Sequence, residues 1–176
     1  EHLADGYEFI LPPHQLGYDC GYGAGQFPKF ADEVYRLENE EAADHKKQLF
    51  MLPTAETALV NIYRGELMPA EELPKKLFAF TPCYRKEAGS ARAEERGMIR
   101  GHQFDKVEIV RIEKPEESYA ALDEMIAHVE KLVSSLGLPY RILRLCGGDM
   151  SFTSAITYDF EVYSAAQGRW LEISSV

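Results

Sequence analysis

Residues 84–108 read YRKEAGSARAEERGMIRGHQFDKVE, and they form the most informative segment of the chain. Arginine guanidinium groups bind phosphate oxygens in pairs, glycine lets the backbone approach a ligand closely, and an aromatic ring such as Phe104 can cover a base. The segment therefore combines the features that a nucleotide-binding site needs. The alternative interpretation is a solvated, arginine-rich loop between two strands, because short motifs also match by chance.

Two β-prone runs flank this segment, at Leu77–Tyr84 and Gln103–Ile112. They predict two antiparallel strands joined by a long working loop. Nearer the N-terminus, Tyr7–Leu11 predicts a short strand that stops at a proline pair, because proline cannot donate to a strand ladder. The runs Val34–Leu37 and Gln48–Met51, with a charged stretch between them, predict a hairpin.

Two helices are expected. Thr54 has the chemistry of an N-cap and Glu56 suits the first turn, so a helix is predicted from there to near Gly65. The second helix is predicted over Pro115–Leu136, with Gly137 as its stop. Its apolar stripe is expected to pack on a sheet and consists of Tyr119, Leu122, Ile126, Val129, Val133 and Leu136.

Three further strands are predicted at Arg141–Leu145, Thr157–Tyr163 and Arg169–Ser174, separated by glycine-containing turns. The glycine-rich stretch 21–25 is interpreted as loop. Strands dominate and several are neighbours along the chain, so we expect an α+β fold with a mixed, mostly antiparallel sheet flanked by helices. A chain of 176 residues fits one domain.

Composition narrows the function classes. The formal net charge of -10 argues against a surface devoted to polyanionic nucleic acid, so any RNA contact is expected to be local. No apolar run approaches the roughly 20 residues that cross a bilayer, and no membrane partner is expected. Three widely spaced cysteines without C-x-x-C spacing favour a cytoplasmic location. The chain has no initiator Met and stops just after Ser175, which we interpret as a piece of a longer protein.

The segment 84–108 resembles the second signature motif of the class II seryl-tRNA synthetases, F-R-x-E-A-G-S-A followed after a variable loop by R-G-L-I-R-V-H-Q-F-x-K-V-E. The resemblance extends over nearly the whole chain. It includes T-A-E at 54–56, G-D-M at 148–150, Y-D-F-E-V at 158–162, E-I-S-S at 172–175, and the end of the first class II motif at 6–13. It implies a class II synthetase-like fold that stops before the third motif and lacks the N-terminal tRNA-binding arm, so that this piece alone would be weakly active or inactive.

The resemblance implies ATP-dependent activation of serine to seryl-adenylate and transfer to tRNA(Ser). Arg85 would be the catalytic residue that holds the α-phosphate, Glu87 would place the adenine end, and Phe104 would stack on adenine. The implied ATP site consists of Arg85, Lys86, Glu87, Arg100, Phe104, Glu172, Ile173, Ser174 and Ser175. Mg2+ would bind Glu172 and Ser175, because this hard ion takes oxygen ligands.

The implied serine pocket consists of Thr54, Ala55, Glu56 and Glu108. An α-ammonium group needs a carboxylate, and a small hydroxyl needs polar partners that an apolar rival would leave unpaired. We expect Thr54, Glu56, Glu108 and Arg85 to converge on one cleft. His102 is interpreted as structural, because a carboxylate nucleophile has no proton to lose.

Each assignment has a plainer alternative. Arg85 could form a surface ion pair with Glu87 or Glu94, and Phe104 could be a core residue on a strand. Thr54 and Glu56 could be an ordinary helix cap and a dipole-matched acid. For Glu108 the alternative is an ion-paired strand residue, because it alternates with Lys106 and Phe104 on one strand face. For Glu172 and Ser175 it is a solvent-facing strand end.

The chain also departs from the family pattern. Residues 92–95 are Arg-Ala-Glu-Glu where G-R-D-T is usual, in a loop that normally covers ATP and touches the tRNA acceptor end. Gly101 stands where valine is usual. Two other functions therefore stay open, a noncatalytic paralogue that binds serine, nucleotide or a protein partner, and a synthetase-like ligase that charges a carrier protein. A homodimer is expected of the full-length protein.

Overall fold

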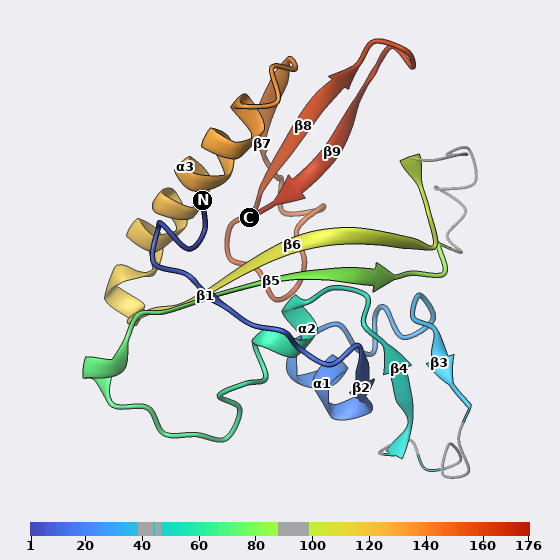
Figure 1. Cartoon of the computed structure of the whole chain (residues 1–176), viewed down its shortest axis with the longest axis vertical. Coiled ribbons are helices and arrows are strands. Elements are labelled where there is room, and N and C mark those ends of the chain that lie inside the picture. Colours follow the sequence, from blue (N-terminus) through green and yellow to red (C-terminus); the bar gives the residue numbers. More distant parts are fainter. Residues whose placement is uncertain (39–43, 45–46, 88–98) are drawn as a thin grey trace. The chain divides into compact units, whose positions relative to one another are not determined.

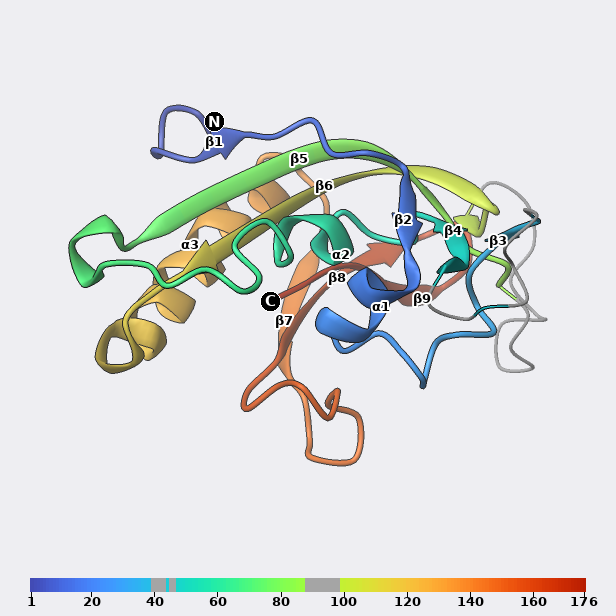
Figure 2. The same cartoon turned by 90° about the horizontal axis from the view of Figure 1, so that it is seen from below.

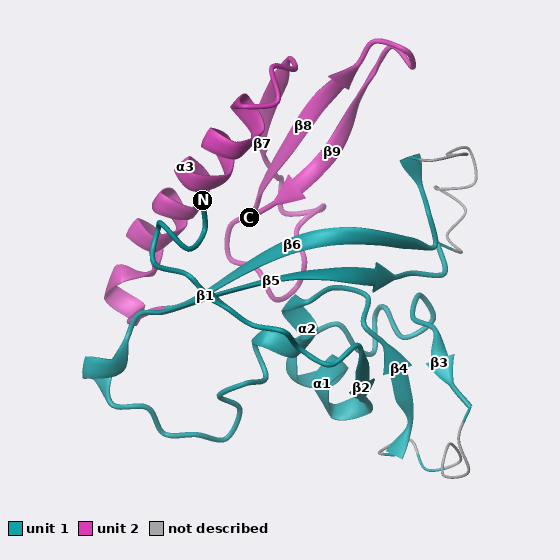
Figure 3. Ribbon diagram, in the orientation of Figure 1, with its two compact units in different colours: residues 1–112 teal, residues 113–176 magenta. Residues whose placement is uncertain are grey.

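The computed structural model describes residues 1–38, 44, 47–87 and 99–176. The chain forms two compact units, Glu1–Ile112 and Glu113–Val176 (Figure 3). Unit 1 contains two three-stranded sheets and unit 2 contains one (Figure 1). Among the described strands, β1 and β5 form the one parallel pair, so the predicted mixed, mostly antiparallel α+β architecture is confirmed, although as three small sheets.

The first sheet of unit 1 is built on the two long predicted strands. β5 (Lys75–Tyr84), preceded by the 3-10 turn η2 (Ala70–Glu72), pairs antiparallel with β6 (Gln103–Ile112) along its whole length. Alternate residues of β5 from Leu77 to Cys83 are buried, as a strand with one core-facing side requires. The predicted N-terminal strand is shorter than expected: β1 (Glu8–Phe9) lies beside β5 (Figure 2).

The second sheet of unit 1 has the order β2-β4-β3, with β2 at Gln15–Gly17, β3 at Arg36–Leu37 and β4 at Leu49–Met51. The antiparallel β3–β4 pair confirms the predicted hairpin in shortened form. The strand β2 was not predicted.

The glycine-rich stretch was wrongly interpreted as loop, because it contributes to the helix α1 (Tyr18–Gly23). Glycine at position 21 serves packing, since a Cβ there would lie 2.4 Å from a ring carbon of Phe27.

The helix predicted from Thr54 to near Gly65 is a single turn, α2 (Glu56–Leu59), followed by turns. Asn61 explains the early end. Its side-chain amide donates to the carbonyl of Thr57, which the Asn61 backbone N–H would use in a continuing α-helix, and that N–H bonds to Ala58 instead. The run of turns ends at Gly65, whose φ of 82° is in the left-handed region.

Unit 2 contains the 3-10 turn η5 (Pro115–Glu117), the helix α3 (Ser118–Ser134) and an antiparallel sheet of order β7-β8-β9. The strands are β7 (Tyr140–Arg144), β8 (Tyr158–Ser164) and β9 (Arg169–Ser175), each within one residue of its prediction. The predicted helix was too long at both ends.

The apolar stripe of α3 is buried only in part. Val129 and Val133 are buried, whereas Tyr119 and Leu136 are exposed, so the expectation of one continuous packed stripe was wrong at its two ends.

The core of unit 1 joins its two sheets and short helices. Its buried residues are Leu16, Phe27, Val34, Phe50, Leu52, Ala55, Ala58, Leu59, Leu77, Ala79 and Cys83. Because β4, α2 and β5 all contribute, this core fixes the segment 52–56 against the face of the β5–β6 pair.

Candidate functional site

Thr54 is the centre of the polar cluster in unit 1. It lies in the connection between β4 and α2, and its side chain is buried. Its hydroxyl donates to Glu108 Oε2 at 2.7 Å and accepts from Lys106 Nζ at 2.7 Å. The backbone N–H of Glu56 donates to the same hydroxyl at 3.3 Å. The N-cap position of α2 is Ala55 and has no side-chain cap bond, so the prediction of Thr54 as the N-cap was wrong, although its hydroxyl accepts from the Glu56 N–H. The same hydroxyl links the α2 turn to β6.

Two residues of β6 complete this link. Lys106 and Glu108 are separated by one position and so share a strand face, and their charged groups are 2.5 Å apart. The ion-paired alternative for Glu108 thus describes a real contact, but the carboxylate also bonds to Thr54. Glu108 is buried more deeply than Lys106, with 19% and 32% of the side-chain surface exposed. A charge-assisted contact at this depth orders both side chains.

Glu56 adds a second carboxylate. Burial, followed by the charge of Glu108, raises the pKa of the Glu56 carboxyl, while the charges of Lys106 and Arg85 lower it. The printed contacts join Thr54 to Glu108 and to the backbone of Glu56, and they hold Arg85 at the carbonyl of Pro53, which directly precedes Thr54. The four residues expected to converge therefore belong to one neighbourhood of unit 1.

Ala55, between the two polar residues of the T-A-E motif, is fully buried in the core of unit 1. Its methyl group anchors the turn, so any contact of Ala55 with a ligand would come from its backbone.

Arg85 follows the end of β5 and is fixed at several points. Its Nε donates to the carbonyl of Pro53 at 3.0 Å, and its backbone N–H donates to the carbonyl of His102 at 2.9 Å. Its guanidinium carbon lies 5.1 Å from the centre of the Phe104 ring. Phe104 also packs against the core, as the alternative interpretation had it. The cation and the aromatic face predicted for phosphate and base are therefore adjacent.

Glu87 and Arg100 form a second charged pair. The Arg100 guanidinium lies 3.6 Å from the Glu87 carboxylate, whose side chain is only 5% exposed. Glu87 has φ of 50°, a left-handed conformation that is uncommon outside glycine and often marks functional sites. Lys86 is held through its backbone N–H, which donates to the carbonyl of Glu33 at 2.9 Å. The loop 92–95, which differs from the family pattern and includes Glu94, lies outside the described residues.

The remaining predicted residues, Glu172 to Ser175, belong to β9 in unit 2. A bulge opposite Phe160 and Glu161 shifts the register, so that Glu172 pairs with Glu161 and Ser175 pairs with Asp159. Asp159 and Glu161 are two positions apart on β8 and share a face, so Glu172 and Ser175 share one as well. Ile173 and Ser174 lie between them in the strand.

Sequence reasoning missed one residue of the Thr54 cluster. Lys106 was noted only as a neighbour of Glu108, although its side chain contacts both Thr54 and Glu108. The signal was the alternation of Phe104, Lys106 and Glu108, which places all three on one face of β6.

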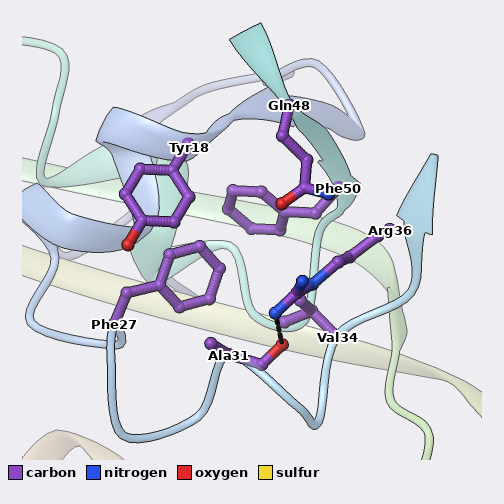
Figure 4. Close-up of a pocket in the computed structure, with 7 residues that line it drawn as sticks. All are labelled: Tyr18, Phe27, Ala31, Val34, Arg36, Gln48 and Phe50. Atoms are coloured by element: carbon purple, nitrogen blue, oxygen red, sulfur yellow. Dashed lines mark hydrogen bonds between the residues drawn. The ribbon is translucent and has the colours of Figure 1, made fainter. Parts of the chain in front are cut away.

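A small pocket elsewhere in unit 1 is lined by none of the predicted residues (Figure 4). It has room for about one water molecule. Figure 4 shows its aromatic rings, and Arg36 closes one side by donating to the carbonyl of Ala31. Its lining residues are Tyr18, Phe27, Ala31, Val34, Arg36, Gln48 and Phe50.

Within the described residues, no group of three or more His, Cys, Asp and Glu side chains is arranged to hold a metal ion. A search of the same residues found no helix with the length and apolar character needed to span a membrane.

Comparisons with known proteins identify the family of the chain. Residues 35–176 match the family described as tRNA synthetase class II core domain (G, H, P, S and T). A protein of Clostridium acetobutylicum named serine–tRNA ligase 2 is 57% identical over 175 residues, which are 99% of this chain and 41% of that protein.

Two solved structures have the same fold. Seryl-tRNA synthetase from Pyrococcus horikoshii complexed with ATP has a TM-score of 0.88 and 32% identity, covering 98% of this chain and 37% of that one. Cytoplasmic serine-tRNA ligase from Naegleria fowleri in complex with AMP has a TM-score of 0.86 and 27% identity, covering 99% and 41%. These likenesses confirm the predicted synthetase-like fold, and the chain spans about two fifths of the length of these relatives. Since the family match extends over most of its residues, the chain belongs to the class II tRNA synthetase core-domain family.

Proposed function

We propose that the full-length protein containing this chain activates serine with ATP and transfers the seryl group to tRNA(Ser). One observation carries the proposal: Thr54, Glu56 and Glu108 form a polar cluster close to the Arg85 cation. Two carboxylates suit an α-ammonium group, and a fixed guanidinium suits a phosphate. The high identity to a relative named serine–tRNA ligase 2 supports serine as the amino acid.

In the activation step, an oxygen of the serine carboxylate attacks the α-phosphorus of ATP, and the bond to the leaving pyrophosphate breaks. No proton has to be removed, so positioning and charge stabilisation are the main demands on the protein. Glu56 and Glu108 would hold the ammonium group, and Arg85 would bind the oxygens of the α-phosphate. The adenine would stack near Phe104, beside Arg85, with Glu87 and Arg100 at the same end of the β5–β6 pair.

Mg2+ is the second cofactor in this proposal. Glu172 and Ser175 offer oxygen ligands on one face of β9, which fits the preference of this ion. When bound, Mg2+ would neutralise charge on the phosphates. Ile173 and Ser174 would contribute to the ATP site through the same strand segment.

The proposal also covers partners and location. Because the chain is acidic, its contact with tRNA(Ser) would be local. The full-length protein would form a homodimer. The free cysteines suit a location in the cytoplasm. The altered loop 92–95, on which the noncatalytic alternative was based, lies outside the described residues.

The test is ATP–pyrophosphate exchange by the full-length protein, with serine, threonine and alanine compared at equal concentrations. The proposal requires exchange that depends on serine, followed by seryl transfer to tRNA(Ser). Exchange without any amino-acid dependence, or none with intact folded protein, would refute it. Serine-dependent exchange with transfer to a carrier protein but not to tRNA would replace the second half of the proposal.

A further inference from the structure

Lys106 occupies a position that the proposed chemistry does not by itself explain. Its ammonium group lies 2.7 Å from the Thr54 hydroxyl and 2.5 Å from the Glu108 carboxylate. Both contacts cross between elements: Lys106 and Glu108 come from β6, and Thr54 comes from the turn that precedes α2. A cation in this place shares the Glu108 carboxylate with the proposed substrate ammonium group, so its presence in the pocket needs an explanation.

The hydrogen-bonding capacity of Thr54 shows what that role is. A hydroxyl has one proton to donate and two lone pairs to accept. The proton of Thr54 is directed at Glu108, one lone pair accepts from Lys106, and the other accepts from the backbone N–H of Glu56. The hydroxyl is therefore fully used within the protein. An ammonium group entering this cluster finds its acceptors on the carboxylates and not on Thr54.

Lys106 also balances the charges of the cluster. The charges that act on the Glu56 carboxyl are the Glu108 carboxylate and two cations, Lys106 and Arg85. The two carboxylates repel each other, and the charge of Lys106 opposes the rise that burial and Glu108 cause in the pKa of Glu56. Without Lys106 the cluster would carry an uncompensated negative charge, and a proton would bind Glu56 more readily.

We propose that Lys106 is a positioning residue of the serine pocket, acting through Thr54: it fixes the hydroxyl as a donor to Glu108 and keeps both carboxylates available for the substrate ammonium group. This inference rests on the proposed function for the identity of the substrate. It assigns to Lys106 no contact with the reacting atoms. An ordinary ion pair on a strand would require neither the bond to Thr54 nor the matching set of donors around that hydroxyl.

The test uses the full-length protein with three variants: Lys106→Met, Thr54→Val and the double variant. Lys76→Met is the control, because Lys76 is on β5 and its ammonium group lies over the Tyr7 ring, outside the cluster. Lys106→Met is expected to raise the KM for serine about tenfold or more while the KM for ATP stays within about twofold. Because Lys106 and Thr54 share one hydrogen bond, the double variant should raise the KM for serine by less than the product of the two single effects.

Two exchange results would overturn the inference. One is a KM for serine in Lys106→Met that equals the value for Lys76→Met. The other is additivity of the two substitutions, which would show that Lys106 does not act through Thr54.

A second measurement separates this inference from the proposed function. In an NMR titration of the carboxyl carbons, Lys106→Met should raise the pKa of Glu56, because the charge that lowers it is lost. This result does not require any turnover. If the wild-type protein shows no serine-dependent exchange, the proposed function fails, and an unchanged Glu56 pKa would then overturn the role of Lys106 as well.

Discussion

Replacing Glu108 by glutamine tests the serine pocket with the smallest change of shape. The amide keeps an oxygen that can accept from Thr54 but loses the negative charge that faces Lys106. If Glu108 also binds the substrate ammonium group, one charge-assisted hydrogen bond is weakened, which costs about 1.5–3 kcal/mol. This energy corresponds to a rise of roughly ten- to hundredfold in the KM for serine. The KM for ATP should change little.

The same substitution has a second, independent consequence. The charge of Glu108 raises the pKa of the Glu56 carboxyl, so its removal should lower that pKa toward the ordinary value. An NMR titration of the full-length protein measures this shift directly. The two effects together distinguish a pocket carboxylate from a residue that only stabilises the strand.

Steady-state ATP–pyrophosphate exchange, with serine and ATP varied separately, is the assay for Glu108→Gln. Glu130→Gln is the matched control: Glu130 also accepts a hydrogen bond, from the Tyr140 hydroxyl at 2.9 Å, but belongs to α3. A KM for serine that is the same in both variants would refute the assignment of Glu108. So would a loss of activity accounted for by unfolding, which a thermal melt of each variant reveals.

Three further outcomes are expected. Glu56→Gln should melt at a higher temperature than the wild type at neutral pH and lose this advantage in acid. The reason is that the pKa of the Glu56 carboxyl is raised, so the stability of the wild type falls as pH rises from the ordinary pKa through the raised one. Equal melting curves at both pH values would contradict this. Gly21→Ala should lower the free energy of unfolding by about 1–3 kcal/mol, since its Cβ would lie 2.4 Å from a Phe27 ring carbon, and an unchanged denaturation midpoint would exclude the overpacking. Asn61→Ala removes two hydrogen bonds, to the carbonyls of Thr57 and Cys20, and should cost about 1–3 kcal/mol in the same denaturation experiment; stability equal to the wild type would argue against their importance.

The strands of the site could be predicted because their pattern is local. The segments Leu77–Tyr84 and Gln103–Ile112 are β-prone runs, a property that is visible in the sequence itself. The three strands of unit 2 were predicted because glycine-containing turns separate them in the sequence. The hydrogen bond between Thr54 and Glu108 joins residues 54 positions apart. Local patterns cannot predict such a contact, and the expectation that the two residues meet came from the family resemblance.

Features that depend on a single side chain or an extra residue were not predicted. Helix α2 ends early because the Asn61 amide takes a carbonyl from the helix, and the same residue elsewhere could lie on a helix surface without effect. In a regular strand, Glu172 and Ser175 would point to opposite faces, and only the bulge in β9 puts them on one. Lys106 was overlooked because an alternating strand lysine is commonly no more than an ion-pair partner.

Binding of an analogue that lacks the amine examines the central idea most directly. Isothermal titration calorimetry of the full-length protein would compare serine with 3-hydroxypropanoate, which keeps the hydroxyl and the carboxylate but has no α-ammonium group. Because the Glu56 and Glu108 carboxylates would hold the ammonium group, we expect serine to bind and the analogue to bind at least about tenfold more weakly. Equal affinities for the two compounds would contradict the account.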